Sequence, residues 1–171
     1  RPIPLAGADH AIREVWRIAL ALLDDAYDGD PPLARLPLFT SIASTRIAVA
    51  RRMIAQQLHA PLAHGVGRYF DAFGAIVLGR SESRHEGQVA MQLGFAADPA
   101  ERRAYRFEIY DEPCRGSIPT VDLRPAVRDS VEDLLAGRSS ASIAGRFHAT
   151  LAAVAVALVE GAARQTGRVP V

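Results

Sequence analysis

This chain is organised around the stretch His59-Ala-Pro-Leu-Ala-His-Gly-Val-Gly-Arg-Tyr-Phe-Asp71-Ala-Phe-Gly-Ala-Ile-Val-Leu-Gly79. A glycine-rich entry leads into an almost wholly apolar segment, which predicts a helix from about Gly67 to Leu78. Asp71 is the only charged residue between Tyr69 and Leu78. Its neighbours three and four positions away, on the same helical face, are Gly67, Arg68, Gly74 and Ala75. Because most of these are small, the face has room beside the carboxylate for a closely packed helix or for a ligand.

Composition indicates a single globular domain over residues 1–171. Hydrophobic residues make up 49% and charged residues 23%, as in an ordinary globular protein, and the net charge of +1 gives no footprint for nucleic acid. Alanine dominates the apolar set, which favours closely packed helices over sheets. Cys114 is the only cysteine, so no internal disulfide can form and we expect a reducing, cytoplasmic setting.

Two further expectations concern the membrane and the chain ends. No uninterrupted apolar run reaches the roughly 20 residues that span a bilayer, and Arg1-Pro-Ile-Pro4 is not a signal peptide, so we expect no membrane contact. The chain opens on Arg1-Pro2 and stops at Arg168-Val-Pro-Val171, where a strand is expected to begin. We therefore expect an incomplete segment of a larger protein.

Helical periodicity accounts for most of the chain. Asp9 is a candidate N-cap for a helix that ends at the prolines of Asp28-Gly-Asp-Pro-Pro32. A half-solvated helix is expected from Ser41, and later helices over about 87–97, 125–137 and 143–162. The apolar side of the helix from Ser41 is expected to consist of Ile47, Ala50, Ile54 and Leu58.

One stretch has a different period. Apolar and polar residues alternate from Tyr105 to Tyr110, which predicts a strand. The strand is expected to turn over 111–116 and to return over 117–121. The predicted fold class is mainly α with one short β-hairpin.

Most candidate reactive groups have an ordinary structural explanation. His59 and His64 are five positions apart and lack the H-x-x-x-H spacing of a helical zinc pair, so this segment is predicted to hold no metal. We expect an inert thiol at Cys114, a satisfied core histidine at His148, and no catalytic residue. The arginines expected on a solvated helix face are Arg46, Arg51 and Arg52.

Asp71 has two interpretations, and both stay open from these residues alone. In the structural one, it is an acid near a helix start that pairs with Arg68. In the functional one, its carboxylate accepts hydrogen bonds from the two hydroxyls of a ribose, and the small neighbours let the sugar approach. Glu86-Gly87, at the start of the next helix, would add backbone N–H groups that face an anionic or polar part of the ligand.

Four blocks make the chain resemble a known family. They are Arg1-Pro-Ile-Pro-Leu-Ala-Gly7 with Ala11-Ile-Arg-Glu-Val-Trp-Arg17, Gly67-Arg-Tyr-Phe-Asp-Ala72, His85-Glu-Gly-Gln-Val-Ala-Met91, and Ile143-Ala-Gly-Arg-Phe-His-Ala-Thr-Leu151. In order and spacing they resemble the middle of the C-terminal catalytic region of the HypF-type carbamoyltransferases, which act in maturation of [NiFe]-hydrogenases. The combination is far more specific than any single block.

The resemblance implies a fold, a reaction and a site. The fold would be part of an actin-like (ASKHA), two-lobed α/β domain related to tRNA threonylcarbamoyl transferases and O-carbamoyltransferases. The reaction would move a carbamoyl group, activated as carbamoyl-adenylate from carbamoyl phosphate and ATP, onto the C-terminal cysteine of a HypE-type partner. Asp71 and Gly87 would contact the nucleotide, flanked by Gly67, Arg68 and Glu86. A divalent metal is implied, with ligands outside this segment, so the segment alone is expected to be inactive.

The sequence also departs from the family pattern. Ala63-His-Gly-Val66 stands where a Thr-Ser-Ser-type run is expected, and Val15 stands where a proline is usual. The missing hydroxyls leave open a relative that carbamoylates a different acceptor. A second alternative, from another functional class, is a non-catalytic helical docking or scaffold module.

Overall fold

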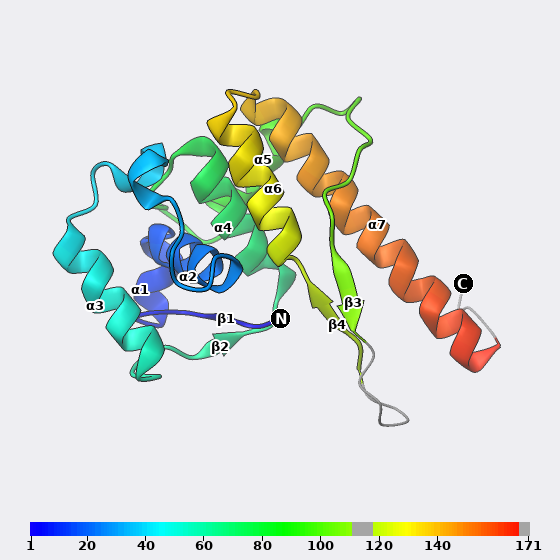
Figure 1. The fold of residues 1–171 in the computed structure, drawn as a ribbon, viewed down its shortest axis with the longest axis horizontal. Coiled ribbons are helices and arrows are strands. Elements are labelled where there is room, and N and C mark those ends of the chain that lie inside the picture. The colour runs from blue at the N-terminus through cyan, green and yellow to red at the C-terminus, as the bar shows by residue number, and fades with distance from the viewer. Residues whose placement is uncertain (111–117, 168–171) are drawn as a thin grey trace.

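Helices make up most of the fold, as the sequence predicts (Figure 1). The structure is a computed structural model that describes residues 1–110 and 118–167. Its helices are α1 (Asp9–Arg13), α2 (Trp16–Ala26), α3 (Ser44–Ala55), α4 (Val66–Leu78), α5 (Gln88–Ala96), α6 (Arg124–Leu135) and α7 (Ser140–Thr166). The 3-10 turns Leu33–Arg35 and Pro37–Phe39 lie between α2 and α3. The strands are β1 (Ile3–Pro4), β2 (Leu62–Ala63), β3 (Glu108–Tyr110) and β4 (Thr120–Asp122).

The predicted β-hairpin is present, together with a second strand pair. β3 and β4 are antiparallel, with Ile109 opposite Val121. The turn predicted over 111–116, which includes Cys114, lies outside the described residues. β1 and β2 are also antiparallel, with Ile3 opposite Ala63, so the start of the chain is tied to the approach to α4. The sequence analysis missed this pair because two residues per strand are too few to show a period.

The first predicted helix is divided into α1 and α2. The backbone N–H of Trp16 donates to the carbonyl of Ser81 at 3.2 Å, a partner distant in sequence, and α2 starts at this point. The prediction of Asp9 as the N-cap was wrong. Ala8 occupies the cap position with a φ of 50° and no side-chain hydrogen bond, and Asp9 is the first helical residue.

Helix α3 is shorter than predicted at both ends. It begins at Ser44 rather than Ser41 and ends at Ala55, so Leu58 lies beyond it and is 55% exposed. Ala50 is the buried residue of α3, in agreement with the predicted half-solvated helix.

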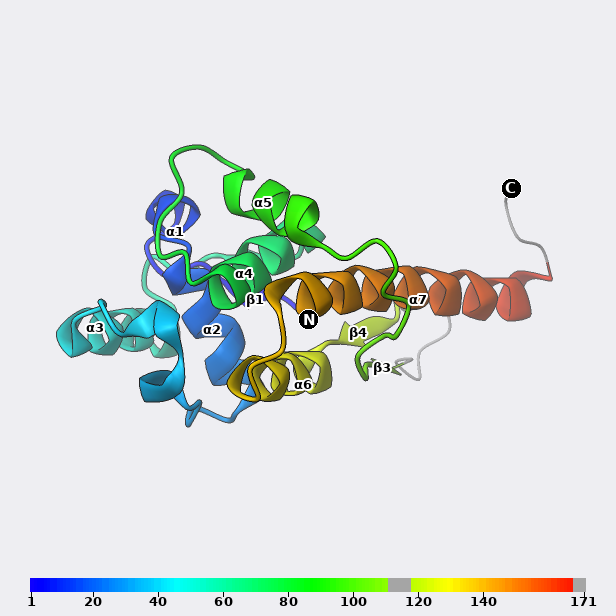
Figure 2. The ribbon, with the colours of Figure 1, turned by 90° about the horizontal axis from the view of Figure 1, so that it is seen from above.

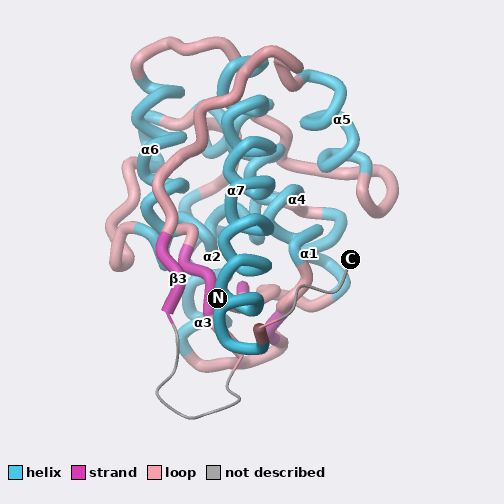
Figure 3. Tube along the Cα trace, turned by 90° about the vertical axis from the view of Figure 1, so that its right-hand side faces the viewer, coloured by secondary structure: helices cyan, strands magenta, loops and turns pink. Residues whose placement is uncertain are grey.

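The core is centred on α2 and α4. Trp16, Ile18, Leu20 and Leu23 of α2 are fully buried, and α4 packs against both α2 and α5. Phe73 of α4 stacks on Phe147 of α7, with ring centroids 4.0 Å apart. Figure 2 shows α5 lying over α4, and the C-terminal half of α7 extending past the other helices. Seen from that end of the molecule, α5 and α6 lie on opposite sides of α7 (Figure 3).

Helix α7 bears on the expectation of no membrane contact. Ser140–Arg164 is long and apolar enough, by length and composition, to cross a bilayer, although 33% of its most apolar part is buried within the fold. Core helices of soluble proteins can be equally long and apolar, so these two properties by themselves assign no membrane role to α7. The absence of membrane contact stays a prediction.

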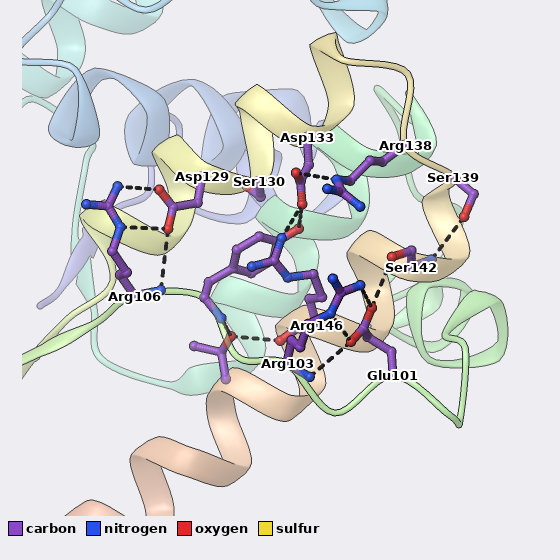
Figure 4. Close-up of polar contacts among 12 residues, drawn as sticks. Glu101, Arg103, Arg106, Asp129, Ser130, Asp133, Arg138, Ser139, Ser142 and Arg146 are labelled. Carbon is purple, nitrogen blue, oxygen red and sulfur yellow. Dashed lines mark hydrogen bonds and ion pairs between the residues drawn. The ribbon is translucent and has the colours of Figure 1, made fainter.

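The segment before β3 is held against α6 and α7 by polar contacts (Figure 4). The backbone N–H of Tyr105 donates to Thr150 Oγ1 at 2.8 Å, and the Tyr105 hydroxyl donates to Asp133 Oδ2 at 3.0 Å. Arg146 donates to the same Asp133 oxygen at 2.6 Å, and its guanidinium carbon lies 4.0 Å from the Tyr105 ring centroid. Because a helix side chain takes the N–H of Tyr105, the strand predicted from that residue begins only at Glu108.

Gly74 lets α4 and α5 approach each other closely. A Cβ built on Gly74 would lie 2.6 Å from Val89 Cγ1 and 2.9 Å from the Val89 carbonyl oxygen, closer than real Cβ contacts. The small residues around Asp71 left room for either a closely packed helix or a ligand. At Gly74 the space is filled by a helix, α5. At Gly67 the outcome differs, because no atom lies within 4 Å of such a Cβ.

We expect Gly74→Ala to lower the free energy of unfolding by about 1–3 kcal/mol, the usual effect of overpacking. The added methyl group would meet the backbone of Val89, which cannot rotate away as a flexible side chain can. Urea denaturation would measure the change. Gly67→Ala is the matched control in the same helix, and its unfolding free energy should be unchanged or slightly higher because alanine is the better helix former. Equal effects of the two substitutions would contradict the close approach at Gly74.

Candidate functional site

Asp71 is a buried acid on the helix at the centre of the fold. It lies in the second turn of α4, and only 3% of the residue is exposed. Its Oδ2 lies 2.9 Å from Nη1 of Arg68, one turn earlier in the helix. The hydrogen bonds found among the described residues include none to either oxygen of Asp71, and Oδ2 is held in the ion pair with Arg68, so Oδ1 stays available as an acceptor. The predicted pairing of Arg68 with Asp71 is confirmed.

Arg68 also contacts a second acid, which lies outside its own helix. Its Nη2 lies 2.5 Å from Glu86 Oε1, in the loop just before α5. One guanidinium therefore joins an acid of α4 to the start of α5. Nη1 of Arg68 is buried and makes no hydrogen bond of good geometry, although it lies close to Asp71. We regard that contact as an ion pair without the direction of a hydrogen bond, because a short distance alone does not make one.

The turn into α5 requires a glycine. Gly87 is the N-cap residue of α5 and has a φ of 76°, in the left-handed region that favours glycine. No atom lies within 4 Å of a Cβ built on Gly87, so its surroundings are open, as they are at Gly67. The amide of Gln88, the residue after Gly87, donates to the carbonyl of His85 at 3.3 Å. The site therefore brings together the predicted residues of both helix starts, with space beside two of the glycines.

The electrostatics of the site disfavour an ionised Asp71. Burial raises the pKa of Asp71 above its ordinary value, Arg68 lowers it, and the nearby Glu86 raises it again, with burial the largest influence. The charged form of this carboxylate is therefore less stable in the folded chain than in water. A buried acid that costs folding energy is typical of a functional position, although structural ion pairs also shift pKa values.

The other candidate residues behave as ordinary structural groups. His148 Nδ1 lies 2.8 Å from the Ala144 carbonyl oxygen, in agreement with a satisfied histidine. Arg46 and Arg51 have side chains that are 44% and 39% exposed, in agreement with the expected solvated face, and they form ion pairs with Glu14 and Asp24. Over residues 1–110 and 118–167, no three His, Cys, Asp or Glu side chains gather as they would around a metal ion.

An apolar groove that the sequence did not reveal lies next to the start of α4. It encloses about 850 Å³, and α4, β4 and α7 line it together with the N-terminal residues. Representative lining residues are Val66, Phe70, Ile118, Leu151, Val154 and Leu158. Ile118 is 87% exposed and Val66 is 55% exposed. No single element shows this pattern, because the groove is formed by segments that are far apart in sequence.

Comparison with known families decides what kind of chain this is. The family model for the carbamoyltransferase Kae1-like domain, second subdomain, matches residues 1–171. The chain belongs to this family. Carbamoyltransferase HypF2 of Cupriavidus necator is 31% identical, over 98% of this chain and 22% of its own length. Carbamoyltransferase HypF of Rhodobacter capsulatus is 36% identical, over 89% of this chain and 18% of its own length.

A solved structure agrees on the fold of this Kae1-like subdomain. It is a crystal structure of full-length HypF in the phosphate- and nucleotide-bound form, with a TM-score of 0.85 and 24% sequence identity. The match covers 98% of this chain and 21% of that one. The predicted mainly helical piece of a HypF-type carbamoyltransferase domain is therefore confirmed, and the chain spans about a fifth of the length of its relatives. Nucleotide binding by Asp71, Gly87, Gly67, Arg68 and Glu86 stays a prediction.

The raised pKa of Asp71 predicts a pH dependence of stability, which tests the role of this residue in the HypF-type subdomain. The stability that protonated Asp71 contributes is fully present below its ordinary pKa of 3.8 and is lost as pH rises through the higher pKa of the folded state. We expect Asp71→Asn to remove this pH dependence and to leave the free energy of unfolding at pH 7 unchanged or higher. Urea denaturation at a series of pH values would measure both.

Asp129→Asn is the matched control. A hydrogen bond from Arg106 holds the pKa of Asp129 below its ordinary value, so the ionised form stabilises the fold above that value and the stability is lost in acid. Its substitution should lower the unfolding free energy at pH 7. If Asp71→Asn lowered the free energy of unfolding at pH 7 by the same amount, the purely structural interpretation of Asp71 would be supported.

Proposed function

We propose that this chain forms one wall of the adenylate-binding pocket of a HypF-type carbamoyltransferase, with Asp71 accepting hydrogen bonds from the ribose hydroxyls. The observation that carries the proposal is a buried carboxylate that is costly to ionise, is paired with Arg68 and accepts no hydrogen bond from the described residues. The open surroundings of Gly67 and Gly87 support it, since they leave room for a ligand at both helix starts.

We propose a reaction for the full-length protein on the basis of its family membership. A carbamoyl group, activated as carbamoyl-adenylate from carbamoyl phosphate and ATP, would pass to the C-terminal cysteine of a HypE-type partner in the cytoplasm during [NiFe]-hydrogenase maturation. Membership in the carbamoyltransferase family and relatives of that name support this proposal. In it, the present chain binds and orients the nucleotide and supplies no catalytic residue, and neither nucleic acid nor membrane takes part. Transfer to a different acceptor is the variant that Ala63-His-Gly-Val66 keeps open.

The side chains that the structure describes in this segment do not fit the divalent metal that the family implies. The described residues offer no group of three or more metal-ligating side chains, and the buried acid Asp71 is already paired with Arg68. We therefore assign the metal ligands to other parts of the full-length protein, and no step of the proposal uses a metal held here.

The apolar groove favours a second candidate function, a helical docking module without nucleotide binding. Isolated apolar side chains are normal on protein surfaces, but a groove with several of them is a feature of protein contacts. In this alternative the Arg68–Asp71 pair is only structural. Nucleotide binding distinguishes the two candidates, because the docking module needs none.

We expect the full-length protein to bind ATP or AMP, and Asp71→Asn to weaken that binding by about 1–3 kcal/mol, the usual loss for one hydrogen bond to a charged group. Isothermal titration calorimetry, with divalent metal present, would measure the affinity. Glu160→Gln removes an exposed acid on the outer half of α7 and should keep the original affinity. Unchanged affinity in Asp71→Asn would reject the pocket assignment and leave the docking module as the better interpretation.

A further inference from the structure

We propose that Arg68 is a positioning residue, which holds the carboxylates of Asp71 and Glu86 at the two helix starts and leaves the second oxygen of Asp71 to the nucleotide. In this role Arg68 acts through Asp71 and does not itself contact the ligand, which differs from the nucleotide contact that the sequence predicts for Arg68. The inference rests on the proposed function. It extends that function from Asp71 to Arg68, the cation that orients the Asp71 carboxylate.

The geometry of the guanidinium carries the inference. Nη1 of Arg68 lies 2.9 Å from Asp71 Oδ2, and Nη2 lies 2.5 Å from Glu86 Oε1. The arginine side chain is 17% exposed, and it lies between an Asp71 side chain that is 5% exposed and a Glu86 side chain that is 68% exposed. Its two nitrogens are therefore occupied by two acids, one inside the fold and one at the surface. Oδ1 of Asp71 has no hydrogen bond among the described residues.

The charges around Asp71 show why such a cation is needed. Burial and Glu86 both raise the pKa of Asp71, and Arg68 is the group that opposes them. Arg68 and Glu86 are the charged groups that influence the pKa of Asp71, and several charged side chains of the neighbouring helices α2, α6 and α7 have partners of their own. These pairs are Arg17 with Glu14, Asp24 with Arg51, Asp129 with Arg106 and Asp133 with Arg146. Arg68 is therefore the cation that favours the ionised form of Asp71, the form whose carboxylate oxygens accept hydrogen bonds.

A purely structural role explains Arg68 less well. The approach of α4 to α5 is already set by the contact of Gly74 with Val89, so the ion pair is not needed to bring these helices together. Buried ion pairs are in general weak sources of stability, because desolvation offsets their attraction. Nη1 of Arg68 also lacks a well-directed hydrogen bond, so its contact with Asp71 contributes little to the stability of the fold.

The test measures the affinity of the full-length protein for ATP as a function of pH. We expect Arg68→Gln to weaken binding roughly tenfold at pH 7, because Asp71 loses the neighbouring positive charge that favours its ionised form. The pH below which binding is lost should rise, because Asp71 without its cation takes up a proton more readily. Arg68→Lys should keep much of the original affinity and much of the original pH dependence, since lysine keeps the positive charge. Glu86→Gln should shift the pH midpoint of binding in the opposite direction, because it removes the neighbouring negative charge.

Each outcome has a separate meaning. If Asp71→Asn keeps full affinity, the proposed function fails. If Asp71→Asn weakens binding while Arg68→Gln keeps the original affinity and pH profile, the function stands and the positioning role is rejected. The positioning role would also be rejected if Arg68→Gln lost the same affinity at all pH values and Arg68→Lys did not restore it. That result would indicate direct contact between Arg68 and the nucleotide. Should Arg68→Gln fail to fold, Glu86→Gln alters an exposed side chain, and an unchanged pH midpoint in that variant would overturn the inference.

Discussion

The site depends on how closely α4 and α5 can approach each other. The two helices meet at Gly74 and Val89, where the absence of a side chain lets the backbone of one helix contact the other. Protein interiors are packed as densely as crystals, so a contact of this kind fixes a distance within a few tenths of an ångström. The start of α5 is thereby held beside α4, and the turn at Glu86 and Gly87 is placed within reach of Arg68.

The charges placed by this packing work against stability. Asp71 is buried among apolar residues, and its partner Arg68 is shared with Glu86. A chain selected only for stability would hold an apolar residue at this position, because replacing a buried ion pair by hydrophobic groups is often neutral or stabilising. Elsewhere the fold uses acids differently. Asp129 and Asp122 have arginine partners that hold their pKa values below the ordinary range, so their ionised forms stabilise the fold.

The sequence predicted those features that depend on short spacings. The helical periods located α4 to α7 within a few residues, the alternation around Ile109 located the hairpin, and the i to i+3 spacing predicted the Arg68–Asp71 pair. Features that need distant segments were missed. The contact of Arg68 with Glu86, the short pairing of β1 with β2 and the apolar groove all depend on where separate elements meet in space. The strand expected from Tyr105 was shortened for the same reason, since the N–H of Tyr105 bonds to a side chain of α7.

Arg68, Asp71, Gly74, Glu86 and Val89 all lie on two consecutive helices and the loop that joins them. Bringing these residues together closes only a short loop, and the entropy lost on closure grows with loop length. Contacts between residues that are close in sequence form readily during folding, because they do not require distant parts of the chain to come together first. The charged half of the site is thus encoded as one helical hairpin, which could be retained, or altered in its charges, independently of the segments that form the groove.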